Sequence, residues 1–202
     1  LKGGGGQPDQ RVRFRTTVHG PVVGYATVNG RKVALSQKRS SYGRDVLDQL
    51  FFQDLTFGKV RNARDFMRAA SRTPQTFSAF YADDREIAMF TTGRLPIRHP
   101  KVDSGLPTKG TGEYEWRGWL PFSRHPQVVK RSGVILNWNN KPAHGWINGD
   151  TELDYGPMQR NLLLERGVRA RPKHTLASLT GVMNAAATQD VRAMEFLPTL
   201  SA

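Results

Sequence analysis

The chain contains no cysteine among its 202 residues. A disulfide framework, a thiolate nucleophile and a cysteine-ligated metal site are therefore excluded. No apolar run approaches the roughly 18 residues that a membrane-spanning helix needs. The first residues contain one lysine and a run of glycines but no apolar core, so we expect no signal peptide there.

Several familiar hydrolytic motifs are missing as well. No serine lies in a Gly-x-Ser-x-Gly or Ser-x-x-Lys motif. The five histidines show no zinc-type spacing, which disfavours a metal-hydroxide hydrolase. His19, which precedes Gly20, is the one histidine that we keep as a candidate, for the edge of a substrate pocket. The alternative is that His19 orders the end of a strand.

The charge is strongly unbalanced, with a formal net charge of +13. Most cations are scattered, and only residues 166–173 form a dense cluster, without a helix-turn-helix, zinc-finger or aromatic RNA-binding signature. A basic module that binds nucleic acid or another polyanion is the alternative function, and a steep salt dependence of binding would identify it. The other interpretation is that the chain is part of a larger protein whose acidic counterpart lies in sequence not shown.

The hydrophobic content of 38% is enough for a core in one large domain or part of one. Residues 1–10 are Gly-rich and are expected to be flexible, and residues 11–17 alternate as a strand does. Two further strands, 22–28 and 32–36, flank Asn29-Gly30, which predicts a hairpin. The helical spacing of apolar residues then predicts a helix from about residue 44 and a second one capped by Asn62.

The second half of the chain is less regular. Short β-like runs at 77–81 and 87–91 flank Asp83-Asp84, and a long excursion over about 95–132 is rich in Pro, Gly and aromatic residues. We expect a strand at 134–138. Helices are expected over about 156–165 and from about 175 to 192, the latter ending before Pro198. Because strands and helices occur in separate runs, the pattern predicts an α+β fold with antiparallel sheet and flanking helices.

The most informative segment is residues 133–142, which read GVILNWNNKP. An apolar run leads directly into three asparagines and one tryptophan. The NH₂ group of an amide held at a strand end can stabilise an oxyanion without exchanging protons. A polar turn that terminates a strand is the alternative interpretation.

Together with residues 105–112 (GLPTKGTG) and 115–122 (EWRGWLPF), this segment resembles the β chain of the penicillin acylase family of N-terminal-nucleophile hydrolases. Weaker matches follow in the same order as in that family. They lie at residues 15–21, 80–83, 92–94, 189–190 and 196–200. The resemblance therefore extends, with gaps, from about residue 11 to the end of the chain.

The resemblance implies a fold and a reaction. Residues 11–202 would form part of a four-layer αββα core, in a periplasmic or secreted, autoprocessed hydrolase of linear amides. Its substrates would include penicillin side-chain amides and N-acyl homoserine lactones. The family nucleophile is an N-terminal serine whose own α-amine is the base. Because this chain begins with Leu1, we expect the nucleophile outside it, and the segment alone to be inactive.

The resemblance also assigns roles to residues. Asn139 matches the family asparagine of the oxyanion hole, so we expect its amide nitrogen to face a cleft, whereas Asn137 and Asn140 suit turn capping better. Arg160 matches an active-site arginine, with a surface helix arginine as the alternative. Trp138 is the aromatic residue nearest the asparagines and a candidate for an acyl pocket, with core packing as the alternative.

The resemblance implies a structural Ca²⁺ ion and two kinds of partner. Asp150 matches a carboxylate ligand of calcium, and Ser104 matches a residue that offers a backbone carbonyl. Two ligands cannot complete a calcium site, so the others would come from elsewhere. The alternative interpretation of Asp150 is a plain turn residue. The expected partners are the remaining α chain, the N-terminal part of the β chain and a small-molecule amide.

Overall fold

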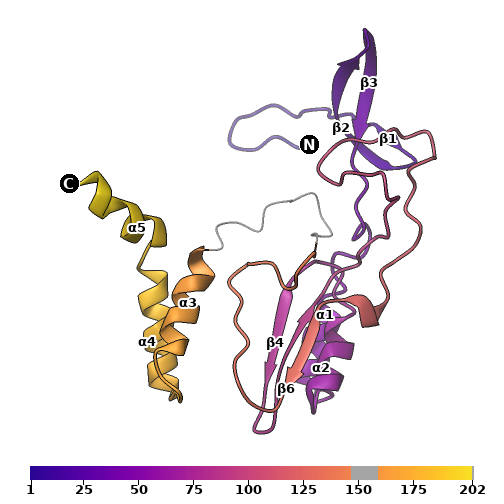
Figure 1. Ribbon diagram of the computed structural model, residues 1–202. Coiled ribbons are helices and arrows are strands. Elements are labelled where there is room, and N and C mark those ends of the chain that lie inside the picture. Colours follow the sequence, from indigo (N-terminus) through magenta and orange to yellow (C-terminus); the bar gives the residue numbers. More distant parts are fainter. Residues whose placement is uncertain (147–158, 202) are drawn as a thin grey trace.

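The computed structural model describes residues 1–146 and 159–201 of the chain. Within them lie two three-stranded antiparallel sheets and five α-helices, which confirms the predicted α+β class (Figure 1). None of the helices in this part of the chain combines the length and the apolar character needed to cross a bilayer.

The first sheet contains β1 (Thr16–Thr17), β2 (Gly20–Val28) and β3 (Arg31–Ser36) in that order. The predicted hairpin is confirmed: Asn29 and Gly30 have φ of 49° and 76°, as a two-residue hairpin turn with two positive φ angles requires. The strand predicted at 11–17 is much shorter. Its pairing with β2 covers only Thr16 and Thr17, and one further bond runs from Val22 N to Arg15 O at 2.8 Å.

The second sheet is built from β4 (Ser78–Ala82), β5 (Ile87–Thr91) and β6 (Gln127–Lys130), with β5 in the centre. Two helices, α1 (Gln49–Thr56) and α2 (Ala63–Ala70), lie beside this sheet in Figure 1, and α2 contacts β4 and β5. The main core forms between α2 and β5. Its buried members are Ala63, Phe66, Met67, Ala70, Ala88 and Phe90.

The predicted cap of α2 is confirmed, because Asn62 Oδ1 accepts a hydrogen bond from Asp65 N at 2.9 Å. The first helix begins five residues later than expected, at Gln49. Strand β6 lies inside the excursion that we expected to lack strands. It has only four residues and follows Pro126, so its sequence carries little periodic signal.

The excursion is anchored to the second sheet near its short 3₁₀ helix, η1 (Phe122–Arg124). His125 is 7% exposed, and its Nδ1 lies 2.8 Å from Thr91 O. Its ring stacks on that of Phe90 with centroids 5.3 Å apart. These contacts assign His125 a packing role.

The chain ends in three helices, α3 (Gln159–Arg169), α4 (Leu176–Ala187) and α5 (Val191–Leu200), which Figure 1 shows to one side of the sheets. The prediction of one helix through residue 192 is wrong. Asp190 ends that run by accepting a hydrogen bond from Arg192 N at 2.8 Å and so capping α5. Pro198 lies inside α5, in its last turn, where the missing N–H removes one backbone hydrogen bond of the helix.

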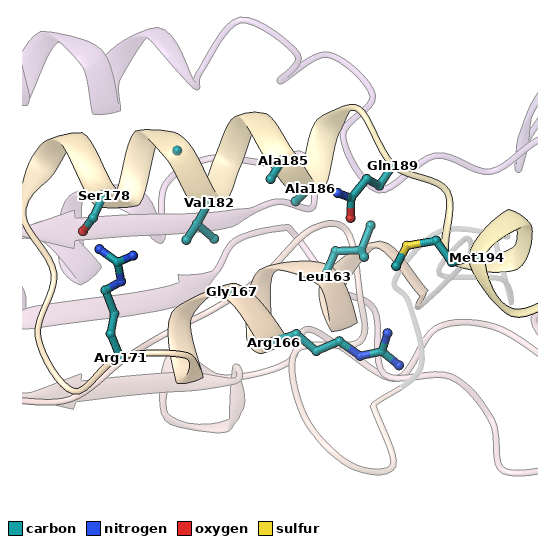
Figure 2. Close-up of a pocket in the computed structure, with 11 residues that line it drawn as sticks. Leu163, Arg166, Gly167, Arg171, Ser178, Val182, Ala185, Ala186, Gln189 and Met194 are labelled. Carbon is teal, nitrogen blue, oxygen red and sulfur yellow. The ribbon is translucent and has the colours of Figure 1, made fainter.

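Helices α3 and α4 approach each other at Gly167. A Cβ atom at this position would lie 2.6 Å from Cγ1 of Val182. Figure 2 shows Gly167 and Val182 on the facing sides of the two helices, with a concavity of about 490 Å³ alongside. The absent side chain of Gly167 therefore sets the close spacing of this helix pair.

The strand predicted at 134–138 is wrong, because the described structure assigns no strand there. Leu136 and Trp138 instead pack against the buried cluster of Leu163, Leu164 and Ala186. Within the apolar run, Leu136 is thus covered by helices α3 and α4 rather than by neighbouring strands, whereas Val134 is exposed. An apolar run of this length does not by itself distinguish these two environments.

Candidate functional site

The Asn-rich segment folds into a tight turn held by its own side chains. Asn137 Nδ2 donates to Asn140 O at 2.9 Å, and Trp138 N donates to Asn140 Oδ1 at 2.7 Å. The backbone N–H of Asn139 donates to Asn137 Oδ1 at 3.1 Å. Asn137 and Asn140 therefore cap the turn, as expected, and the side chain of Asn139 takes no part in it.

Asn139 lies at the strained position of this turn. Its φ is +59°, a left-handed conformation that asparagine tolerates better than most residues with a Cβ atom. The turn thus fixes the direction in which the Asn139 side chain leaves the backbone. A residue needed only for turn formation could equally be glycine here.

The structure brings Arg160 to Asn139. Arg160 Nη2, in the first turn of α3, donates to Asn139 Oδ1 at 3.2 Å, and the Arg160 Cζ atom lies 5.3 Å from the centre of the Trp138 ring. A guanidinium group carries donors and no acceptor, so it selects the amide oxygen of Asn139 as its partner. The amide NH₂ is then directed away from Arg160.

Two donor atoms of this site have no partner in the described part of the chain. Asn139 Nδ2 donates to no described residue, and Arg160 Nε is buried without an acceptor among the described residues. Asn139 itself is exposed, and it lines none of three concavities in this part, of about 490, 720 and 310 Å³. The cleft expected around its nitrogen therefore stays a prediction.

The other candidate residues lie in different surroundings. Trp138 is half-buried against α3 and α4, which is a packing contact. His19 lies in the turn between β1 and β2, where its Nε2 is 2.5 Å from Glu115 Oε1, and no described contact joins it to Asn139. A pocket role for either residue remains a prediction.

The expected calcium site cannot be assembled from the described residues. Asp150 lies outside them, and Ser104 is half-buried in a turn. The described residues contain no group of three or more His, Asp or Glu side chains that could hold a metal ion. Calcium requires six to eight oxygen ligands, so most of them would have to come from outside the described residues.

One cluster was not anticipated from the sequence. Glu115 binds His19 and also forms an ion pair with Lys38, whose ammonium lies 4.6 Å from the centre of the Trp116 ring. The bond to Lys38, followed by that to His19, lowers the pKa of Glu115. Because Glu115 and His19 are 96 residues apart, no local pattern could have paired them.

Comparison with solved structures gives the class of the fold. The chain superimposes on a thermostable penicillin G acylase from Alcaligenes faecalis with a TM-score of 0.83 and 28% sequence identity. The match covers 98% of this chain and 36% of that one. The fold is therefore that of a penicillin acylase segment, in agreement with the predicted α+β class.

Sequence comparison agrees. The chain is 31% identical over 189 residues to the penicillin G acylase of Escherichia coli, a match that covers 92% of this chain. It is 29% identical over 164 residues to a penicillin acylase 2 proenzyme of Pseudomonas sp. (strain SE83), covering 74% of this chain. The penicillin amidase family model matches residues 2–202, and the chain belongs to that family.

The chain is much shorter than these relatives. It spans 22% of the Escherichia coli protein and 19% of the Pseudomonas proenzyme. Family membership therefore applies to this segment, and the activity of a whole protein is a separate question.

Proposed function

We propose that this chain is a segment of an amidohydrolase that cleaves linear amides, with Asn139 as a donor in its oxyanion hole. The proposal is supported by family membership and by the hydrogen bond from Arg160 to Asn139. The nucleophile would be an N-terminal serine supplied outside this chain. The relatives named penicillin acylases make a penicillin side-chain amide a candidate substrate, with N-acyl homoserine lactones as another.

The proposed reaction proceeds through an acyl-enzyme. The serine hydroxyl attacks the carbonyl carbon of the amide while the α-amine of the same residue takes the hydroxyl proton. The carbonyl oxygen becomes an oxyanion, which accepts a hydrogen bond from Asn139 Nδ2 and a second one from a backbone N–H outside this chain. When the tetrahedral intermediate collapses, the amine leaves with the proton that the α-amine had taken, and the acyl-enzyme remains. Water then attacks the acyl-enzyme and releases the carboxylic acid.

Arg160 acts in this scheme as a positioning residue. Its hydrogen bond holds the oxygen of the Asn139 amide, so that the NH₂ group is the part left to face the substrate. The cation also favours negative charge in its neighbourhood. Arg160 Nε is buried without an acceptor among the described residues, so in this scheme its acceptor would come from the rest of the protein.

Hydrolysis of a chromogenic phenylacetyl amide tests this function. The chain expressed together with the flanking sequence of its gene should release the chromophore, and the 202-residue chain alone should not, because nucleophile and base are expected elsewhere. Turnover by the 202-residue chain alone would contradict the proposed division of roles. No turnover of phenylacetyl or longer acyl amides by the extended protein would contradict the amidohydrolase itself.

A further inference from the structure

A groove of about 720 Å³ lies between the first sheet and the long excursion, and its chemistry is not used in the proposed reaction. Its lining combines cations with aromatic rings. The members that matter here are Arg94, Trp119, Tyr42, Lys38 and Arg39. None of these residues belongs to the Asn-rich turn.

The cations of this groove are not equally compensated. Lys38 pairs with Glu115, and Arg39 pairs with Asp45 at 2.6 Å. Arg94 forms no ion pair with a carboxylate in the part of the chain that the structure describes, and its Nη1 donates only to Ser40 O at 3.0 Å. Among the described residues, Arg94 is therefore the arginine of the groove without a carboxylate partner.

The environment of Arg94 makes this lack of an anion costly. The side chain is half-buried, and burial, followed by the charge of nearby Arg44, lowers its pKa. Arg44 likewise has no acidic partner among the described residues. Two neighbouring guanidinium groups repel each other, and an anion between or beside them would relieve that repulsion.

The groove also offers aromatic surface next to this charge. The Arg94 Cζ atom lies 3.5 Å from the centre of the Trp119 ring, which holds the guanidinium in place. Trp119 remains 38% exposed and Tyr42 73% exposed, so both present apolar surface that a ligand could cover.

We infer that this groove binds a small carboxylate attached to an aromatic body, with the carboxylate on Arg94 and the ring against Trp119 and Tyr42. A carboxylate matches the guanidinium fork, and an aromatic body gains from burial on the two exposed rings. Inorganic phosphate shares the anionic part of this chemistry and lacks the aromatic part. The inference does not depend on the proposed hydrolysis.

Calorimetric titration with sodium benzoate tests this site. We expect one saturable site with Kd on the order of 1 mM. Arg94→Gln should weaken binding about tenfold or more, and Arg44→Gln should weaken it by a smaller factor. Arg85→Gln is the matched control, since that arginine is 84% exposed and lies in a distant turn. The Arg85→Gln variant should bind benzoate with the affinity of the unmodified protein.

Two further ligands separate charge from shape. Benzamide, the neutral analogue, should not bind detectably, and phosphate should bind more weakly than benzoate. Arg94→Gln also removes the hydrogen bond to Ser40, so this variant could fail to fold. Quenching of tryptophan fluorescence by benzoate then gives a second measure of binding, and this quenching should be lost in Trp119→Phe.

Four results would overturn the inference. They are no saturable benzoate binding up to about 10 mM, equal binding of benzamide, equal loss of affinity in Arg85→Gln, and loss of binding in the gene-length protein. The last would mean that a carboxylate of the protein itself occupies Arg94.

Discussion

Arg160 Nη2 donates a hydrogen bond to Asn139 Oδ1 at 3.2 Å, and this bond ties the Asn-rich turn to the first turn of α3. The two residues are 21 positions apart, and their contact orients an amide that the turn itself does not use. The bond accounts for an asparagine at a position where glycine would fit the backbone equally well.

If Arg160 acts through Asn139, the two residues should be coupled in turnover. We expect Arg160→Ala to lower kcat for a phenylacetyl amide about tenfold or more, since a charge-assisted hydrogen bond is lost. In an Asn139→Gly background the same substitution should lower kcat little further.

The coupling has a matched control on the same helix. Arg169, whose side chain is 78% exposed and pairs with Glu165, should tolerate Arg169→Ala without a change in kcat. Equal losses from Arg160→Ala in both backgrounds would show that Arg160 does not act through Asn139.

The positive φ of Asn139 predicts a difference in stability between two substitutions. Asn139→Ala and Asn139→Gly both remove the bond to Arg160, but only alanine is strained at φ of +59°. We expect the alanine variant to be about 1 kcal/mol less stable than the glycine variant in urea unfolding. Asn29, with φ of 49°, provides the matched pair and should show the same difference with no effect on turnover. Equal stabilities at position 139 would contradict the strained turn.

The two glycines of the C-terminal helices should respond oppositely to alanine. At Gly167 the new Cβ would lie 2.6 Å from Val182 Cγ1, a stiff β-branched side chain, so we expect Gly167→Ala to destabilise by about 1–3 kcal/mol. At Gly181 nothing lies within 4 Å of the new Cβ, so helix propensity should stabilise Gly181→Ala by about 1 kcal/mol. Urea midpoints measure both effects. Stabilisation by Gly167→Ala would mean that α3 and α4 are not packed as described.

Glu115 predicts a pH-dependent contribution to stability. Its pKa is lowered in the folded protein by Lys38 and then by His19, so its charged form is favoured by folding. That contribution is fully present above the unfolded pKa of about 4.3 and is lost as the pH falls through the lower folded pKa. Glu115→Gln should therefore lower the urea midpoint at about pH 7. The difference in urea midpoint between the variant and the original protein should become smaller at about pH 3. The effect should be small, because the side chain is 44% exposed.

A control separates this ion pair from a general charge effect. Asp84, which is 84% exposed, should tolerate Asp84→Asn with almost no change in the urea midpoint at either pH. If the difference in urea midpoint between the original protein and Glu115→Gln stays constant with pH, the role assigned to the carboxylate is contradicted.

Local sequence signals were sufficient where local contacts determine the structure. Asn29-Gly30 predicted its hairpin turn and Asn62 predicted its helix cap, because each depends on residues within a few positions. The strand predicted at 134–138 failed because its environment is supplied by α3 and α4. The break between α4 and α5 was missed because a cap at Asp190 outweighed an apolar pattern that continues through it.

The candidate site shows the same division. Residue types in the Asn-rich turn suggested an amide donor, and the family resemblance directed attention to Asn139 and Arg160, but only the fold shows their contact. The pairing of His19 with Glu115, and the place of Arg94 over Trp119, depend on the path of the long excursion. Weak periodicity left that path unpredictable from the sequence.

Steady-state kinetics of Asn139→Gly tests the account most directly, since glycine removes the amide and keeps the backbone unstrained. In the gene-length protein we predict that kcat for a phenylacetyl amide falls about 10²–10³-fold. KM should change little, and Asn184→Ala, an exposed position on α4, should leave both constants unaltered. Asn139→Gly with the kcat of the original protein would contradict the role of this amide in stabilising the oxyanion.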